Sequence, residues 1–271
     1  MSTLLPQAES LSSDELLPHQ QSFWQQQGEY VSTNSPFYQA LWGSQPVPLD
    51  LRDLPLLPLS NKAQLRISQA NHPPFGDYLA SSQTNVTRLH RTSGTTGQAM
   101  NLAMSSADCE ITEAVGGRSH CAAGLTANHT VVHCLNYQMW MGGVTDHLTL
   151  ERTGATVVPF GVGNTARLVK TIREIGITAI SCTPSYPMVI ERVIAEQFPG
   201  LNPRDLGLQL GLFGGEPGLD DSSLRDRIRD TWACSRAMPT MVYPMYFPTL
   251  RPNASMTHGY TFLLQMCSTR N

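Results

Sequence analysis

The stretch RTSGTTGQAM (91–100) gathers glycine, serine and threonine in an order that can bind an anion. Glycine permits positive φ and close approach of the backbone, so successive N–H groups of such a turn can converge on one phosphate. Serine and threonine hydroxyls add donors that rotate toward phosphate oxygens. The stretch is not a Walker loop, because no Gly-Lys-Ser or Gly-Lys-Thr follows it. The residues alone fit either a polyphosphate-binding loop or a flexible, hydroxyl-rich connector.

A second glycine turn, GGEP (214–217), ends an apolar run that is typical of a buried strand. In open α/β sheets, ligands bind outside the carboxyl ends of the strands. The turn therefore stands where a ligand site is expected, although its four residues taken alone equally describe an ordinary turn.

The elements that must position these turns follow an α/β pattern. Residues 1–85 indicate helical and extended segments broken by prolines, and we expect the proline-rich PVPLDLRDLPLLPLS (46–60) to be an extended connector. Short β-branched runs then alternate with helical patterns, at 130–137, 155–160, 177–183 and 208–214. One helix should bury Leu168, Ile172 and Ile175 on a shared face. Alternating strands and helices predict a mainly parallel sheet in an α/β core at 86–232.

Composition excludes several classes of protein. The 271 residues are 41% hydrophobic and carry a net charge of −3, so we expect no nucleic-acid partner. No apolar run approaches the ~18 residues of a membrane span, and the N-terminus lacks the features of a signal peptide. The six cysteines form no C-x-x-C pair and no zinc spacing, so we predict no metal ligands among them. A cytoplasmic protein follows; composition sets no oligomeric state.

The order of several segments resembles the adenylate-forming enzymes, and among them the phenylacetate–coenzyme A ligases most closely. The segments that carry this resemblance, within residues 30–232, are SPFYQALW, LRDLPLLPLSNKAQLR, RLHRTSGTTGQAMNL, GGVTDHLTLERTGATVVPFGVGNTARLVKTIREIGITAISCTPSY and NPRDLGLQLGLFGGEPGLDD. The resemblance implies the N-terminal part of the family's large domain, here truncated, with the α/β core at 86–232 as an incomplete nucleotide-binding core. It also implies ATP, Mg²⁺ and coenzyme A as cofactors, with a small carboxylic acid that is activated as an acyl-adenylate.

The resemblance assigns candidate site residues. The β- and γ-phosphates of ATP would be held by Thr92, Ser93, Gly94, Thr95, Thr96 and Gly97. Adenine and ribose would lie against Gly214, Gly215, Glu216 and Pro217. One position departs from the family, because Gln98 stands where a lysine is usual and supplies no positive charge to the phosphates.

LNYQMWMGG (135–143) stands where the family builds its acyl pocket. The predicted pocket residues are Asn136, Tyr137, Trp140 and Met141, with Tyr186 on the substrate side. Aromatic rings and methionine form an adaptable wall that suits an aryl or other apolar acid. Ordinary core packing behind a strand explains the same residues equally well.

The last segment, 233–271, differs in composition from the rest. It contains no Asp, Glu or Lys, whereas the first 232 residues carry all 21 acidic groups. Read in a shifted frame after Trp232, codons allowed for 233–255 can encode GMQSRNANYGVSDVFSNVASECE. This string contains the Tyr-Gly-apolar-Ser-acid motif that the family places after its GGEP helix. We therefore expect 233–271 to be a non-native, disordered, frameshifted tail.

Because of the frameshift, this chain would lack the family's Mg²⁺-binding acid, ribose-binding Asp and catalytic Lys. The leading hypothesis is an ATP-dependent carboxylate–CoA ligase in a truncated, inactive form that retains no Mg²⁺ site. One alternative is an adenylate-forming synthetase that does not use CoA. The other is a non-catalytic nucleotide-binding remnant.

Overall fold

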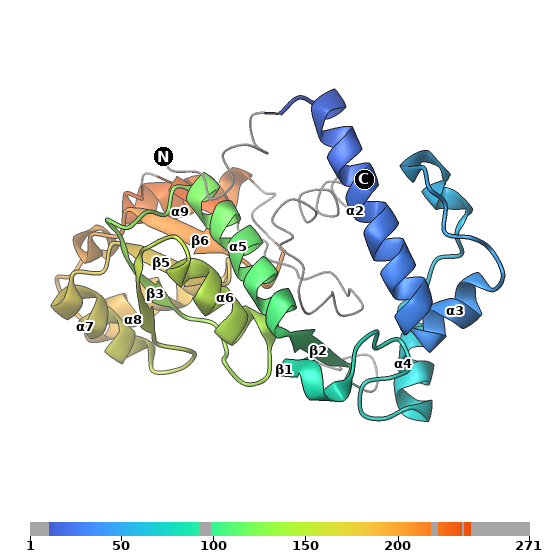
Figure 1. Ribbon diagram of the computed structural model, residues 1–271. Helices are drawn as coiled ribbons and strands as arrows, with labels where there is room; N and C mark the ends of the chain where they lie inside the picture. Colours follow the sequence, from blue (N-terminus) through green and yellow to red (C-terminus); the bar gives the residue numbers. More distant parts are fainter. Residues whose placement is uncertain (1–10, 93–98, 218–221, 235, 240–271) are drawn as a thin grey trace. The chain divides into compact units, whose positions relative to one another are not determined.

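The computed structural model describes residues 11–92, 99–217, 222–234 and 236–239 (Figure 1). The described residues form two units, one ending at Thr112 and the other starting at Glu113. Helix α5 (Ser106–Ala123) begins in the first unit and continues into the second. In the parts of the chain that the structure describes, no helix combines the length and the apolar character that a membrane span needs.

The N-terminal unit is mostly helical, as expected for 1–85. Its elements are α2 (Ser13–Asn34), α3 (Pro36–Trp42), η1 (Leu51–Leu56), α4 (Lys62–Asn71), η2 (Gln83–Asn85), β1 (Val86–Arg91) and β2 (Asn101–Ser105). Strands β1 and β2 pair in antiparallel fashion. Helix α2 begins with a capping box, in which Ser12 and Glu15 each bond the other's backbone N–H.

The proline-rich connector is not wholly extended, so that prediction needs correction. Residues 51–56 form the 3₁₀ helix η1, with Pro55 inside it. Asp50 begins the turn by accepting the Arg52 N–H at 2.8 Å. A 3₁₀ turn uses i→i+3 bonds and is common in short connectors, which explains why a proline-rich segment can adopt it.

The C-terminal unit is an α/β domain with a five-stranded parallel sheet, which confirms the predicted fold class (Figure 1). The strand order is β4-β3-β5-β6-β7. The strands are β3 (Thr130–His133), β4 (Thr156–Pro159), β5 (Ala179–Cys182), β6 (Leu210–Phe213) and β7 (Arg236–Pro239). The helical elements, besides α5, are α6 (Met141–Glu151), α7 (Thr165–Ile175), α8 (Tyr186–Gln197), η3 (Pro203–Leu206) and α9 (Ser222–Trp232).

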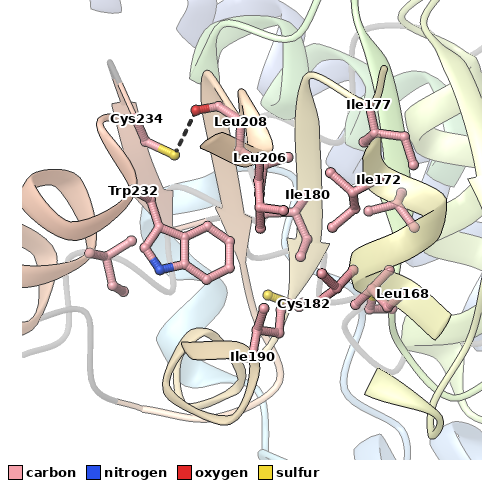
Figure 2. Packing of buried hydrophobic residues seen from close by; sticks show 14 of the residues in the cluster. Leu168, Ile172, Ile177, Ile180, Cys182, Ile190, Leu206, Leu208, Trp232 and Cys234 are labelled. Atoms are coloured by element: carbon pink, nitrogen blue, oxygen red, sulfur yellow. Dashed lines mark hydrogen bonds between the residues drawn. The ribbon is translucent and has the colours of Figure 1, made fainter. Parts of the chain in front are cut away.

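Alternate residues of the strands feed two separate cores. Val132 and Ile180 pack with side chains from α7, α8 and α9, the cluster drawn in Figure 2. Val131 and Ala179 pack on the opposite face with Ala123 of α5 and Leu150 of α6. The period of two along each strand therefore assigns α7, α8 and α9 to one face of the sheet, and α5 and α6 to the other.

One predicted core residue is not buried. Leu168 and Ile172 of α7 are fully buried, but the Ile175 side chain is 54% exposed. Ile175 ends the helix, and Gly176 follows it in the left-handed conformation. The predicted face is therefore correct for the first two turns and wrong at the last residue.

Part of the segment after Trp232 is ordered in the sheet, which differs from the disordered tail expected from residue 233. Residues 236–239 form β7 and pair in parallel with β6. Cys234 is buried, and its Sγ donates to the Leu208 carbonyl at 3.2 Å (Figure 2). Strand pairing uses backbone groups, so it places little demand on the side chains of β7. Residues 240–271 lie outside the described residues.

Candidate functional site

The parallel sheet has a topological switch point between β3 and β5. Strand β4 lies on one side of β3, whereas β5, β6 and β7 follow on the other side. Ligands of open α/β sheets bind at such a point, outside the carboxyl ends of the strands. Asn136 and Tyr137 follow β3, Tyr186 follows β5, and Gly214 to Pro217 follow β6. The structure therefore brings these predicted residues to one edge of the sheet.

The predicted phosphate loop belongs to the N-terminal unit, between β1 and β2. Its two ends are bonded together, since Thr92 N donates to the Met100 carbonyl at 3.0 Å. Met100 N donates in turn to Thr92 Oγ1 at 2.9 Å. The other predicted phosphate ligands, Ser93 to Gly97, and Gln98 lie outside the described residues.

The GGEP turn is tied to the neighbouring strand β5 and the loop that follows it. Gly214 N donates to the Cys182 carbonyl at 3.1 Å. The Glu216 carboxylate accepts the backbone N–H of Ser185 at 2.7 Å. Gly215, Glu216 and Pro217 are exposed, so the turn presents its surface at the sheet edge.

Trp140 of the predicted acyl pocket lies directly against the GGEP turn. A Cβ added to Gly215 would come within 3.0 Å of Trp140 Cη2, and one added to Gly142 within 2.7 Å of Trp140 Cζ3. Gly215 also has φ +88°, a conformation that side chains rarely adopt. The backbone conformation thus favours glycine at 215, the indole ring leaves little room for a side chain there, and the predicted pocket segment meets the turn at this point.

The remaining residues of the predicted acyl pocket have local partners. Asn136 Oδ1 accepts the Gln138 N–H at 2.9 Å and so forms a turn after β3. Tyr186 pairs its hydroxyl with Thr165 Oγ1 at 3.1 Å, and burial raises the pKa of Tyr186. Met141 is the partly buried first residue of α6.

Tyr137 begins a line of polar contacts that the sequence did not reveal. Its hydroxyl lies 3.0 Å from Nδ1 of His147, and His147 Nε2 lies 3.0 Å from Glu151 Oε1. Burial raises the pKa of Tyr137, so its phenol stays protonated at neutral pH. His147 and Glu151 stand four residues apart in MGGVTDHLTLE, a spacing that places both on one helix face and was the signal available in the sequence.

Two further histidines hold α6 against the rest of the C-terminal unit. His133 lies 3.1 Å from Ser181 Oγ through Nδ1 and 2.9 Å from the Gly142 carbonyl through Nε2. Since a carbonyl only accepts, Nε2–H donates to it and the Ser181 hydroxyl donates to Nδ1. His120 of α5 contacts Thr149 Oγ1 at 3.0 Å. Burial lowers the pKa of both imidazoles to about 4, so they are neutral structural groups.

Asp146 is the one unexplained ionisable group on α6. Its Oδ1 atom is buried without a hydrogen-bond partner, and burial raises the carboxyl pKa to about 7. No three His, Cys, Asp or Glu side chains within the described ranges form a group that could hold a metal ion.

The sequence comparisons point to one group of enzymes. The chain is 35% identical over 222 residues to a phenylacetate-coenzyme A ligase of Pseudomonas putida, which covers 80% of this chain and 49% of the relative. A phenylacetate-coenzyme A ligase of Thermus thermophilus is 33% identical over 218 residues, covering 78% of this chain and 47% of that protein. The chain thus spans about half the length of the curated relatives it matches. No family model matches it.

Solved structures agree with the sequence comparisons. An open conformation of 2-hydroxyisobutyryl-CoA ligase, in complex with 2-HIB-AMP and CoA, is similar with a TM-score of 0.81 and 29% identity. That match covers 89% of this chain and 53% of the solved one. The same enzyme in its thioesterification state gives a TM-score of 0.79 at 32% identity, over 84% and 49% of the two chains. The resemblance inferred from the motifs is therefore confirmed, and the chain belongs to the phenylacetate–coenzyme A ligase-like branch of the adenylate-forming superfamily.

Proposed function

We propose that this chain carries the nucleotide- and acyl-binding part of an ATP-dependent carboxylate–CoA ligase that acts on an aryl or other apolar acid. The observation that carries the proposal is the contact between Trp140 and Gly215 at the carboxyl edge of the sheet, which joins the predicted acyl pocket to the predicted nucleotide turn. The relatives that match the chain over most of its length are named phenylacetate-coenzyme A ligases.

In the proposed reaction a carboxylate oxygen of the acid attacks the α-phosphorus of ATP and pyrophosphate leaves. The thiol of CoA then attacks the acyl carbon, and AMP leaves. ATP supplies the adenylyl group that makes the carboxylate reactive. Residues 92–97 would hold the β- and γ-phosphates, and 214–217 would bind adenine and ribose. The GGEP turn is exposed and is held in place by the bond of Glu216. A rigid, exposed backbone can pack closely against the flat base of a nucleotide, which supports this assignment.

The acid would lie against Asn136, Tyr137, Trp140, Met141 and Tyr186. Their aromatic rings and thioether favour an apolar acyl group over a charged one. Mg²⁺ would be bound mainly through the phosphates of ATP, since no three His, Cys, Asp or Glu side chains among the described residues form a group that could hold it alone. We also place the protein in the cytoplasm, in keeping with the free thiols of Cys109, Cys121, Cys134, Cys182 and Cys234.

The proposal includes a change of reading frame after Trp232 that leaves this form inactive. Its support is the lack of Asp, Glu and Lys in 233–271 and the family motif recovered by the shifted frame. The β6–β7 pairing is compatible with it, because backbone pairing tolerates foreign side chains. Genomic DNA sequenced across codons 230–235 tests this point. An uninterrupted frame that encodes the present tail would refute it.

Nucleotide binding tests the function itself. We expect calorimetric titration of the chain to show ATP binding without pyrophosphate release when phenylacetate is added. Gly215→Ala should weaken that binding, since the backbone is strained at φ +88° and the added methyl group would lie 3.0 Å from Trp140 Cη2. Gly200→Ala is the matched control: Gly200 has a similar φ of +81° but open space around it, so it carries the backbone strain alone. Equal ATP affinity in Gly215→Ala and wild type would contradict the proposal.

A protein whose reading frame is restored after Trp232 separates the three functional alternatives. CoA-dependent release of AMP would support the ligase, and release that ignores CoA would favour a synthetase with another acceptor. ATP binding with no turnover in the repaired chain would identify a non-catalytic remnant.

A further inference from the structure

Tyr137, His147 and Glu151 form a continuous hydrogen-bonded line from the loop after β3 to the exposed end of α6. The Tyr137 hydroxyl lies 3.0 Å from His147 Nδ1, and His147 Nε2 lies 3.0 Å from Glu151 Oε1. The Glu151 side chain is 51% exposed, whereas that of His147 is only 16% exposed. The line therefore runs from a half-buried phenol to a carboxylate in water.

The chemistry of the line fixes its direction. An ionised carboxylate only accepts, so the proton between His147 and Glu151 sits on Nε2. In the neutral imidazole Nδ1 is then an acceptor, and the Tyr137 hydroxyl must donate to it. The burial that keeps the phenol protonated preserves this donor. The carboxylate thus selects the tautomer of His147, and the tautomer selects the role of the Tyr137 hydroxyl.

The close approach of α6 to the β3 loop makes the contact possible. A Cβ on Gly143 would come within 2.4 Å of the Asn136 carbonyl and 2.6 Å of Tyr137 Cα, so only glycine allows this spacing. His147 is four residues further along α6, on the same face as Gly143. His133 holds the first turn of the helix by donating to the Gly142 carbonyl. The first turn of α6 is therefore held by contacts other than the one between His147 and Tyr137.

We propose that His147 and Glu151 are positioning residues that hold the Tyr137 hydroxyl toward α6, so that Tyr137 offers its ring to the acyl group of the acid. This inference rests on the proposed function for its substrate. With its proton committed to His147, the phenol cannot donate to the acid, and the acid meets an apolar ring. The arrangement favours an unsubstituted aryl or alkyl group at this point of the pocket.

The tautomer gives a test that needs no activity. Long-range ¹H–¹⁵N correlation spectra of the full chain should show the neutral imidazole of His147 as the Nε2–H tautomer, with the signal assigned by its loss in His147→Leu. Tyr137→Phe should move the Nδ1 resonance, because only the hydroxyl is removed. Glu151→Gln should retain the tautomer, since an amide oxygen also accepts, whereas Glu151→Ala should not. An Nδ1–H tautomer in the wild type, or an Nδ1 resonance unmoved in Tyr137→Phe, would overturn the inference.

Titration with phenylacetate adds the functional readout. His147→Leu and Tyr137→Phe should each weaken phenylacetate about fivefold, the effect of one lost neutral hydrogen bond, and the double variant should be no weaker than either. ATP affinity should stay within twofold in all three, which a general loss of structure would not allow. Additive losses in the double variant would refute the coupling of the two residues. A wild-type chain that binds neither ATP nor phenylacetate would refute the proposed function, and the tautomer spectra would still decide the positioning role.

Discussion

Replacing Asp146 with asparagine should stabilise the folded chain, and the gain should depend on pH. Asp146 Oδ1 is buried without a partner, and the carboxyl pKa is raised from 3.8 to about 7 by burial. The folded state therefore holds a proton that the unfolded state releases between these two pH values. The contribution of the Asp146 carboxyl to the free energy of unfolding is fully present below pH 3.8 and is lost as the pH rises to about 7. Asparagine keeps the shape and removes the ionisation.

The magnitude follows from the size of the shift. At about 1.4 kcal/mol per pKa unit, a rise from 3.8 to about 7 corresponds to roughly 4 kcal/mol above pH 7. Asp146 as a residue is only partly buried, so contact with water reduces this upper value to about 2–4 kcal/mol.

Two histidines titrate in the opposite direction. The pKa values of His120 and His133 are lowered from 6.5 to about 4, so the unfolded state binds their protons first as the pH falls. Their contribution is complete above pH 6.5 and is lost toward pH 4. Between pH 4 and 6.5 the unfolded state binds two more protons at the histidines and one fewer at Asp146. The free energy of unfolding of the wild type should therefore rise by about 1.4 kcal/mol per pH unit from these three groups. Asp146→Asn should double that slope.

Urea unfolding followed by circular dichroism at several pH values measures both quantities. The variant and the wild type should have similar free energies of unfolding at pH 4, and the variant should lead by about 2–4 kcal/mol at pH 8. Asp230→Asn is the control, since the Asp230 side chain is 74% exposed. A gain that is equal at pH 4 and pH 8, or no gain at pH 8, would refute the reasoning, because ionisation of a buried carboxyl would then not be the cause.

Two further substitutions test packing in the two units. In the N-terminal unit, Gly28→Ala would place Cβ within 2.4 Å of Val47 Cγ1 and should lower the free energy of unfolding in urea by about 1–3 kcal/mol. Adding Val47→Ala should restore it, and no recovery would show that Val47 is not the obstacle. In the C-terminal unit, Glu191→Ala removes the acceptor of the Trp232 indole at 2.9 Å and of the Arg227 guanidinium at 3.1 Å, and should cost about 1–3 kcal/mol; an unchanged urea midpoint would contradict that role.

The repeating elements of this fold were readable in the sequence. Runs of Val and Ile bounded by turns predicted the parallel strands, and the 3.6-residue spacing of Leu168 and Ile172 predicted the buried face of α7. These patterns are local, so one stretch of sequence contains the whole signal. The error at Ile175 has the same origin, because a period cannot show where the covering neighbour ends.

The contacts of the site were not readable in this way. Tyr137 and His147 are ten residues apart and belong to a loop and a helix, so no periodicity links them. Their contact depends on the approach of α6, which a single glycine at 143 permits. The family resemblance predicted a substrate site at Tyr137 and Trp140, but it gave no information on the side chains that contact them. Burial of Asp146 likewise depends on what packs around α6, which only the tertiary structure supplies.

Helix α6 combines one destabilising group with several contacts that hold it in place. Its first turn is held by the neutral His133, and its close approach to the β3 loop depends on Gly143. Asp146 destabilises the same helix at neutral pH, whereas its neighbour His147 reaches the Tyr137 hydroxyl. A helix is stiffer than a loop, so a tyrosine tied to it keeps its ring orientation more closely. Removing the cost of burying Asp146 should therefore leave the contact between His147 and Tyr137 intact.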